Sequence, residues 1–379
     1  MKILIVTNYL PPKIGGIERI SHELATALNL IQGVEVSVVS AKWPSKFIET
    51  DWGEIDYLYE VLYVPSITIF RRLPVPNIFR RQFWAQMGDL NDDFDLVFYQ
   101  SHLFVLNWII AVKLRRMKRR IWMNPGCNYV PINSRVGSRL SFLYERLGMT
   151  IMKSFCNEFV GQSKNTAEWM ALKVGIPFQV LSNAINMQQF NGENEFEDRK
   201  LKTSVLFVGR LVEGKGLLDC ISAVSEANQM LRHSGSTNLL TLTVVGSGPL
   251  KDSVSNYKPL MEISWRGELS HSQVIASMYQ HDILIQAYSQ PEGLTTVTLE
   301  GLAAGMLIVT TPVSGEGDLD GSINYVPGAL SELPSLLLKS RDRAEKRSEL
   351  VSTGRQFIEA GFTWDIIAKK LILQDYSNV

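Results

Sequence analysis

The sequence predicts an α/β protein made of two doubly wound domains that face each other across a cleft. Its 379 residues are enough for two domains of roughly 150 residues each. Short β-branched runs alternate with longer amphipathic stretches, which is typical of a parallel sheet flanked by helices. The alternation stops once, at the polar stretch Asn191–Lys202, and then restarts, so a linker is expected there.

The first domain is expected over residues 1–190 and the second over residues 191–361. In the first, the expected strands are Ile3–Thr7, Val34–Ser40, Leu96–Tyr99, Arg120–Met123, Phe155–Val160 and Phe178–Leu181, with helices from near Ile17 and over Arg139–Lys153 and Asn165–Val174. In the second, the expected strands are Ser204–Val208, Leu240–Val245, Glu262–Trp265, Ile283–Ala287 and Leu307–Thr311, with helices over Gly216–Leu231 and Ser272–Gln280 and from about Thr296. In such sheets, ligands bind beyond the carboxyl ends of the strands.

Charge is balanced overall but unevenly distributed. The 38 Lys and Arg equal the 38 Asp and Glu, which argues against a globally basic nucleic-acid binder. Residues 1–190 hold 21 basic and 15 acidic side chains, a net of +6, and the second half balances them. The excess lies within residues 71–120, with 10 basic and 4 acidic groups. One specialised surface is therefore expected in the first half.

The protein is expected to be cytoplasmic, or attached to a membrane only at its surface. Its cysteines, Cys127, Cys156 and Cys220, show no CxxC pattern, which suits a reducing compartment and offers no zinc site. The apolar run near the N-terminus is too short for the core of a signal peptide. The longest apolar stretch, Leu103–Val112, is far shorter than a membrane span.

Two glycine-containing loops follow expected strands of the second half. The segment from Val208 to Gly216 reads VGRLVEGKG, so that Arg210 and Lys215 stand above a strand end among glycines. Such a loop suits phosphate, although a glycine turn with two solvated cations has the same pattern. The second loop, Gly246-Ser-Gly248-Pro, reads as a tight turn, and its role beside a nucleotide depends on the other loops.

The most specific signal is the segment from Pro291 to Gly305, PEGLTTVTLEGLAAG, which follows the strand Ile283–Ala287. Thr295 or Thr296 is a natural helix N-cap, so free backbone N–H groups near Leu294–Thr296 would offer an anion site. Glu292 and Glu300 flank this site and suit hydrogen bonding to sugar hydroxyls. Alternatively, Glu292 is a solvated loop residue and Glu300 stabilises the helix dipole.

With these motifs in the observed order, the chain resembles the retaining glycosyltransferases of family four, which have the GT-B architecture of two Rossmann-like domains. The resemblance rests on EGLTTVTLEGLAAG with its Glu292-x7-Glu300 spacing, on Gly209-Arg210 with Lys215-Gly216, and on Gly246–Pro249. Gly15-Gly16 with the Glu18 helix start also matches. So does FTWDIIA from Phe362, which is similar to the family's last helix, so that a helix over about 362–379 is expected to pack back on the first domain.

The resemblance implies a nucleotide-sugar site in the second domain and an acceptor site in the first. Arg210 and Lys215 would neutralise the donor diphosphate, with help from the N–H groups near Leu294–Thr296. Glu300 would hold the ribose, and Glu292 the transferred sugar. Gly16 would let the first-domain loop approach the donor or the acceptor, and Gly248 belongs to the same donor side. The resemblance implies no metal, a UDP- or GDP-sugar donor, and transfer of a hexose to a glycan or lipid-linked acceptor in bacterial surface polysaccharide or lipopolysaccharide synthesis.

The first domain departs from the family pattern. Where the family often has a Pro-His-Gly-like element, this chain reads MNPGCNYVP from Met123, with no histidine. Asn124 or Asn128 can supply a hydrogen bond there but not acid–base chemistry. Gly15 and His102 are further acceptor-side candidates, although a histidine after a strand is often only structural.

Basic and aromatic residues combine in residues 70–84 and 113–120, the second of which is expected to close a helix. Cations among Phe70, Phe79, Phe83 and Trp84 suit an anionic membrane surface or a lipid-diphosphate acceptor, although helix-end cations can also be simply solvated. Nucleic-acid binding lacks any recognisable module. The expected membrane-facing cations are Arg71, Arg72, Arg80, Arg81, Arg115, Arg116, Arg119 and Arg120.

Two other functions remain open from the sequence. A sugar-nucleotide epimerase would use the same donor loops but should show further acidic or histidine acid–base residues. A non-catalytic nucleotide-sugar-binding subunit is favoured by the missing histidine and disfavoured by intact Glu292 and Glu300.

Overall fold

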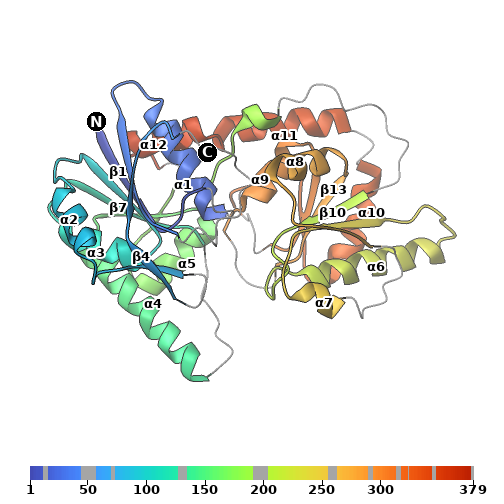
Figure 1. The fold of residues 1–379 in the computed structure, drawn as a ribbon. Coiled ribbons are helices and arrows are strands. Elements are labelled where there is room, and N and C mark those ends of the chain that lie inside the picture. The colour runs from blue at the N-terminus through green and yellow to red at the C-terminus, as the bar shows by residue number, and fades with distance from the viewer. Residues whose placement is uncertain are drawn as a thin grey trace. The chain divides into compact units, whose positions relative to one another are not determined.

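The computed structural model describes residues 1–11, 16–43, 57–69, 73–126, 135–190, 204–254, 263–288, 293–312, 317–322, 324–343 and 347–376. The chain divides into two compact units, each built around its own parallel sheet (Figure 1). Unit 1 comprises Met1–Ser182 and Trp364–Asn378, and unit 2 comprises Asn183–Thr363. The α/β class and the two Rossmann-like sheets are as predicted.

Unit 1 contains a seven-stranded sheet of order β3-β2-β1-β6-β7-β8-β9, in which all neighbouring strands are parallel. Its elements are β1 (Lys2–Thr7), α1 (Gly16–Asn29), β2 (Glu35–Ala41), β3 (Glu60–Val64), β4 (Ser66–Ile69), β5 (Leu73–Pro76), α2 (Arg81–Asp89), β6 (Leu96–Gln100), α3 (Val105–Lys113), β7 (Arg119–Asn124), α4 (Arg135–Phe155), β8 (Glu158–Gly161), α5 (Lys164–Val174), β9 (Gln179–Val180) and α12 (Trp364–Leu373). The strands β4 and β5 form a separate antiparallel pair.

Helices cover the sheet of unit 1 on both faces. Apolar side chains of α2, α3, α4 and α5 share one core cluster with residues of β1, β6 and β7, including Phe83, Leu106, Met152 and Met170. The helices α1 and α12, which stand far apart in the sequence, pack against each other (Figure 1). The central strands β1 and β6 are short and mostly apolar because they are buried on both sides, whereas the edge strands β3 and β9 are more exposed.

Unit 2 contains a six-stranded parallel sheet of order β12-β11-β10-β13-β14-β15. Its elements are the 3₁₀ turn η2 (Met187–Phe190), β10 (Ser204–Val208), α6 (Leu217–His233), β11 (Thr241–Val245), α7 (Leu250–Val254), β12 (Ile263–Gly267), α8 (His271–Tyr279), β13 (Ile283–Gln286), α9 (Thr296–Ala303), β14 (Leu307–Thr310), β15 (Tyr325–Pro327), η3 (Leu330–Glu332), α10 (Leu333–Arg343) and α11 (Arg347–Gly361). One face packs against α6 and α10 and the other against α8 and α9, and α11 contributes apolar side chains to the core clusters of both faces.

Several predicted elements differ from the structure. The strand predicted to begin at Phe155 begins at Glu158, because Phe155 is the last residue of α4. The segment 113–120 does not close a helix: α3 ends at Lys113, and Arg119 and Arg120 already belong to β7. The elements that the sequence did not predict include β3, the β4–β5 pair, α2, β15, α10 and α11.

Candidate active site

In each sheet the chain adds its next strands on one side of the first strand and its later strands on the other side. The first strand therefore lies at a topological switch point. In unit 2, β10 pairs with β11 on one side and with β13 on the other. In unit 1, β1 lies between β2 and β6 in the same way. At such a point, the loops after the two adjacent strands run to opposite faces of the sheet. This leaves a crevice beyond the carboxyl ends of the strands. The predicted donor loops follow β10, β11 and β13, so they converge on the crevice of unit 2.

Two glycines allow the loop after β11 to lie against the loop after β10. Gly246 and Gly248 have φ values of 134° and 152°. A Cβ atom at Gly246 would overlap the carbonyl oxygen of Gly209, and one at Gly248 would overlap that of Leu211. The loops are joined by backbone hydrogen bonds, including one of 2.8 Å from Leu211 N–H to Ser247 C=O. The Gly246–Pro249 turn therefore has a packing role that its sequence did not indicate.

A third glycine joins the loop after β10 to the end of β13. Gly216 is the N-cap of α6 with a φ of 71°, and a Cβ atom there would overlap the carbonyl oxygen of Ala287. The preceding residue, Lys215, is half-buried, and its Nζ lies 5.2 Å from the centroid of the Tyr288 ring. A cation at this distance from a ring face is attracted by it. Arg210, on the same loop, is exposed.

The N-terminus of α9 follows β13 and is ordered by threonines. Thr295, one of the two residues predicted as the N-cap, is the N-cap, and its Oγ1 accepts a 3.3 Å hydrogen bond from Thr298 N–H. Thr298 donates through its own hydroxyl to Gln286 Oε1 at 2.7 Å. Leu294 is buried, and its carbonyl accepts from the Asn183 side chain at 3.2 Å. Thr296 is the first residue of α9 and is partly exposed.

Glu300 lies in the second turn of α9 with only 2% of its surface exposed. Its Oε1 is 3.1 Å from the Nε2 atom of His271, which is the first residue of α8. A capping box between Ser270 and Gln273 orders the start of α8 and thereby places His271. Sequence reasoning missed His271, because it stands 29 residues before its partner.

Two of the acceptor-side candidates of unit 1, His102 and Asn124, lie in a buried polar network. His102 follows β6 and is 1% exposed, and its Nδ1 is 3.0 Å from Oδ1 of Asn124, the last residue of β7. His102 Nε2 lies 3.8 Å from Glu145 Oε1, within ion-pair but outside hydrogen-bond distance. Ser101, immediately before His102, has a φ of 73°, which is unusual for a residue with a side chain.

Glu145 is the acidic member of this network. Burial raises its pKa, but His102 and Lys173 favour the charged carboxylate, and the net pKa lies below the ordinary value. Lys173 Nζ donates to Glu145 Oε1 at 3.2 Å. His102 is therefore held between Asn124 and the carboxylate of Glu145 inside unit 1.

Gly16 is exposed at the start of α1, with open space where a Cβ atom would stand. Glu292, Gly15 and Asn128 lie outside the described residues, as do Arg71 and Arg72.

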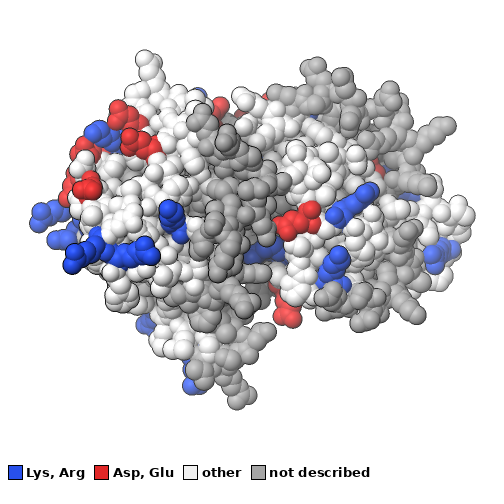
Figure 2. Space-filling model, viewed as in Figure 1, with Lys and Arg blue, Asp and Glu red and all other residues white. Residues whose placement is uncertain are grey.

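The predicted basic surface is only partly correct. Arg80, Arg81, Arg115 and Arg116 are exposed, and Figure 2 shows basic side chains over the region where α2 and α3 lie. Arg119, however, is buried, and its Nε and Nη2 each donate to Glu158 at 2.8 Å. Arg120 is partly buried and donates to the carbonyl of Phe155. The prediction is wrong for Arg119, because a partner across the sheet neutralises it. None of the described helices is both long and apolar enough to span a bilayer.

The two sheets and the loops that converge at the carboxyl end of β10 define a two-domain nucleotide-binding α/β protein of the GT-B type. The family model for glycosyl transferases group 1 matches residues 202–333, and the model for glycosyltransferase family 4 matches residues 14–189. The chain belongs to this family of retaining glycosyltransferases, which transfer a sugar from a nucleotide-sugar donor.

Individual relatives agree with this assignment. An uncharacterized glycosyltransferase of Methanocaldococcus jannaschii is 26% identical, over 96% of this chain and 95% of its own length. The structure of HepE from Anabaena in complex with UDP-glucose has a TM-score of 0.70 at 14% identity, and each chain is 99% covered. The structure of WaaG, a glycosyltransferase involved in lipopolysaccharide biosynthesis, has a TM-score of 0.62 at 16% identity, with 98% of this chain and 99% of WaaG covered. The two solved structures are similar in fold.

Proposed function

We propose that this glycosyltransferase moves a hexose from a UDP- or GDP-sugar to a glycan or lipid-linked acceptor in bacterial surface polysaccharide synthesis. The observation that supports this most is the convergence of three loops at the β10/β13 switch point, with Lys215 on one side and the N-terminus of α9 on the other. The complex of HepE with UDP-glucose and the role of WaaG in lipopolysaccharide biosynthesis support the donor and acceptor classes.

The donor diphosphate would lie between Arg210, Lys215 and the first turn of α9. Two cations balance its charge, and the free N–H groups near Leu294–Thr296 add hydrogen-bond donors at the positive end of a helix. Gly248 lets the loop after β11 lie against Leu211 in the loop after β10, because it adds no side chain between them. Since charge grows on the diphosphate as the sugar leaves, these groups would stabilise the transition state more than the ground state.

Glu300 would accept hydrogen bonds from the ribose hydroxyls. Its burial and its contact with His271 limit its rotamers, so the carboxylate is oriented before the donor arrives. Glu292 would contact hydroxyls of the transferred sugar as the catalytic residue of the pair. Retention is attributed in this family to front-face attack, in which the leaving phosphate accepts the proton of the acceptor hydroxyl, and no protein nucleophile is then needed.

The acceptor would bind on the side of unit 1, near Gly15, Gly16, His102, Asn124 and Asn128. The buried network fixes His102 and Asn124, so their role would be to shape the acceptor surface rather than to transfer protons. A peripheral contact with an anionic membrane through the exposed Arg80, Arg81, Arg115 and Arg116 would bring a lipid-linked acceptor within reach.

The experiment is a transfer assay with purified protein, a panel of UDP- and GDP-hexoses, and membrane lipid extract as acceptor. The proposal predicts release of the nucleoside diphosphate with one donor and a product whose anomeric configuration matches that of the donor. Conversion of the donor into an isomeric nucleotide-sugar would instead indicate an epimerase. Donor binding without release or transfer under any condition would indicate a non-catalytic subunit.

A further inference from the structure

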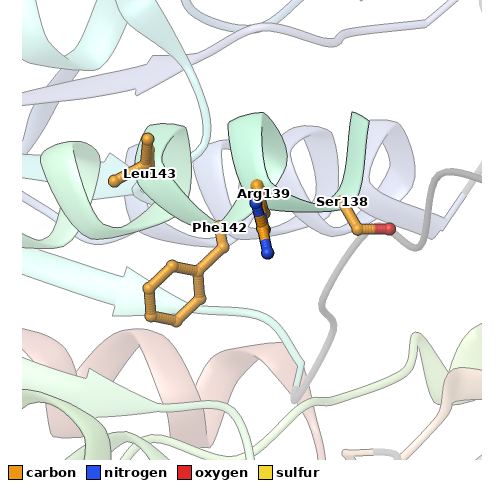
Figure 3. Close-up of a pocket in the computed structure, with 4 residues that line it drawn as sticks. All are labelled: Ser138, Arg139, Phe142 and Leu143. Carbon is orange, nitrogen blue, oxygen red and sulfur yellow. The ribbon is translucent and has the colours of Figure 1, made fainter. Parts of the chain in front are cut away.

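One helix of unit 1 carries an apolar surface that the donor and acceptor sites leave unexplained. On α4, the side chains of Leu140, Phe142, Leu143 and Leu147 are 61%, 51%, 59% and 52% exposed. Figure 3 shows Phe142 and Leu143 projecting from α4 near Arg139 and Ser138, with which they line a shallow pocket. Single exposed apolar residues are ordinary, but four within two turns of one helix mark an interaction surface.

The opposite face of α4 is held rigidly by unit 1 itself. A Cβ atom at Gly148 would overlap the carbonyl oxygen of His102, so the helix touches the segment after β6 closely. Tyr144 donates to the carbonyl of Leu103 at 2.6 Å, and its ring lies 4.9 Å from that of Trp108. Because these contacts fix the rotation of α4 about its axis, the leucines cannot turn inward without unpacking the unit.

The charges of α4 are equally one-sided. Between residues 137 and 155, the exposed charged side chains are Arg139, Arg146 and Lys153, whereas the acidic Glu145 is buried and paired with Lys173. Where α4 is visible in Figure 2, no acidic side chain lies over it. The helix dipole accounts for a cation in the last turn but disfavours one near the start, where Arg139 stands. The outward face is therefore apolar and cationic.

This combination favours one occupant. A two-fold contact with a second copy of the chain would bring like charges together. A nucleic acid would satisfy the arginines but would leave the leucines in water. The interfacial layer of an anionic bilayer accepts both, because leucine and phenylalanine enter the acyl boundary while arginines reach the phosphates. We propose that the outward face of α4 (Leu140, Phe142, Leu143 and Leu147 with Arg139 and Arg146) docks into an anionic phospholipid surface.

The test is vesicle flotation of the full chain, with phosphatidylcholine alone and with equal parts of phosphatidylcholine and phosphatidylglycerol. We expect binding to the anionic vesicles only. The variant Arg139→Gln/Arg146→Gln should lower the partition coefficient about 25-fold, which is the product of about fivefold for each cation. The variant Leu143→Ser/Leu147→Ser should lower it at least about tenfold.

Matched control variants change comparable groups elsewhere. Leu172→Ser alters an 87% exposed leucine of α5, and Lys251→Gln/Lys339→Gln removes two exposed cations of unit 2. Both should bind like the unaltered chain. All the changed positions are exposed, so thermal unfolding should be the same in every variant and checks that each has folded.

The proposal is overturned if the α4 variants float like the unaltered chain. The four arginines Arg80, Arg81, Arg115 and Arg116 can contact the membrane beside α4, so a partial loss of flotation on their neutralisation is compatible with the proposal. The proposal is overturned if Arg80→Gln/Arg81→Gln/Arg115→Gln/Arg116→Gln abolishes flotation while the α4 variants retain it, because α4 would then contribute nothing to docking. Binding that is equal with neutral vesicles, or concentration-dependent dimerisation that the leucine variant removes, would point to another occupant. Donor turnover is measured in a separate assay. The flotation result therefore tests membrane docking even if the protein proves not to be a transferase.

Discussion

In unit 2 the loops that leave β10, β11 and β13 touch one another through backbone atoms, whereas in unit 1 the segments that leave β6 and β7 are joined through buried side chains. Gly216, Gly246 and Gly248 stand where any Cβ atom would overlap a neighbouring carbonyl. His102, Asn124 and Glu145 instead fill the corresponding end of unit 1. Close contact between backbones adds no side chain at the strand ends of unit 2, where Arg210 is exposed and Lys215 half-buried, whereas buried side chains fill the corresponding end of unit 1.

The largest expected effect is loss of turnover when the cation is removed from the backbone-built site. In Lys215→Ala, kcat/KM for the donor should fall about 100- to 1,000-fold, as when one stabilising group is lost from a developing anion. Steady-state kinetics measure this. Lys251→Ala removes an exposed cation from α7 of the same unit and should leave kcat/KM unchanged. Similar kinetics in the two variants would remove Lys215 from the site.

Gly216→Ala tests whether backbone contact holds the loops together. A Cβ atom there meets Ala287 in a left-handed backbone, so we expect about 2–3 kcal/mol of destabilisation. Gly214→Ala in the same loop has a φ of 88° but open space, and should cost about 1 kcal/mol. Urea unfolding followed by a probe in unit 2 measures the difference. An equal loss of stability in the two variants would mean that the close contact of Gly216 with Ala287 does not contribute to the free energy of unfolding.

His271→Asn should have a smaller effect, because His271 is proposed to position Glu300 rather than to touch the donor. Loss of one hydrogen bond predicts a rise of about 2- to 10-fold in the KM for the donor, with kcat nearly unchanged. His281→Asn is the control, since His281 contacts Thr243 instead. A fall in kcat without any change in KM would contradict a positioning role.

The smallest effect concerns the side-chain network of unit 1. The pKa of Glu145 lies below its ordinary value in the folded chain, so its contribution to stability is present above the unfolded pKa and is lost as pH falls through the folded pKa. Glu145→Gln should therefore be less stable than the unaltered chain at neutral pH, and this difference in the free energy of unfolding should shrink as the pH is lowered. Urea unfolding at several acidic pH values measures it. A difference that does not change with pH would show that His102 and Lys173 do not interact with the carboxylate.

The sequence predicted the local signals of unit 2, whereas in neither unit did it reveal contacts between residues that stand far apart along the chain. Glycines, loop cations and the Thr295 cap act over a few residues, so their pattern is visible along the chain. The ion pair between Arg119 and Glu158 joins residues 39 apart, and His271 stands 29 before Glu300. Such pairings depend on sheet order and helix packing. The β4–β5 pair was missed because Pro74 and Pro76 argue against a strand, yet an isolated antiparallel pair tolerates them.

The central claim is that the loop after β10 in unit 2 holds the nucleoside diphosphate. Calorimetric titration with UDP, and separately with GDP, tests it most directly in two matched double variants. Arg210→Ala/Lys215→Ala should raise the Kd for the bound nucleotide at least about tenfold, equivalent to about 1.4 kcal/mol. Arg115→Ala/Arg116→Ala, which removes exposed cations of unit 1, should leave it unchanged. Equal affinity in the two variants, or a loss confined to the second, would contradict the account.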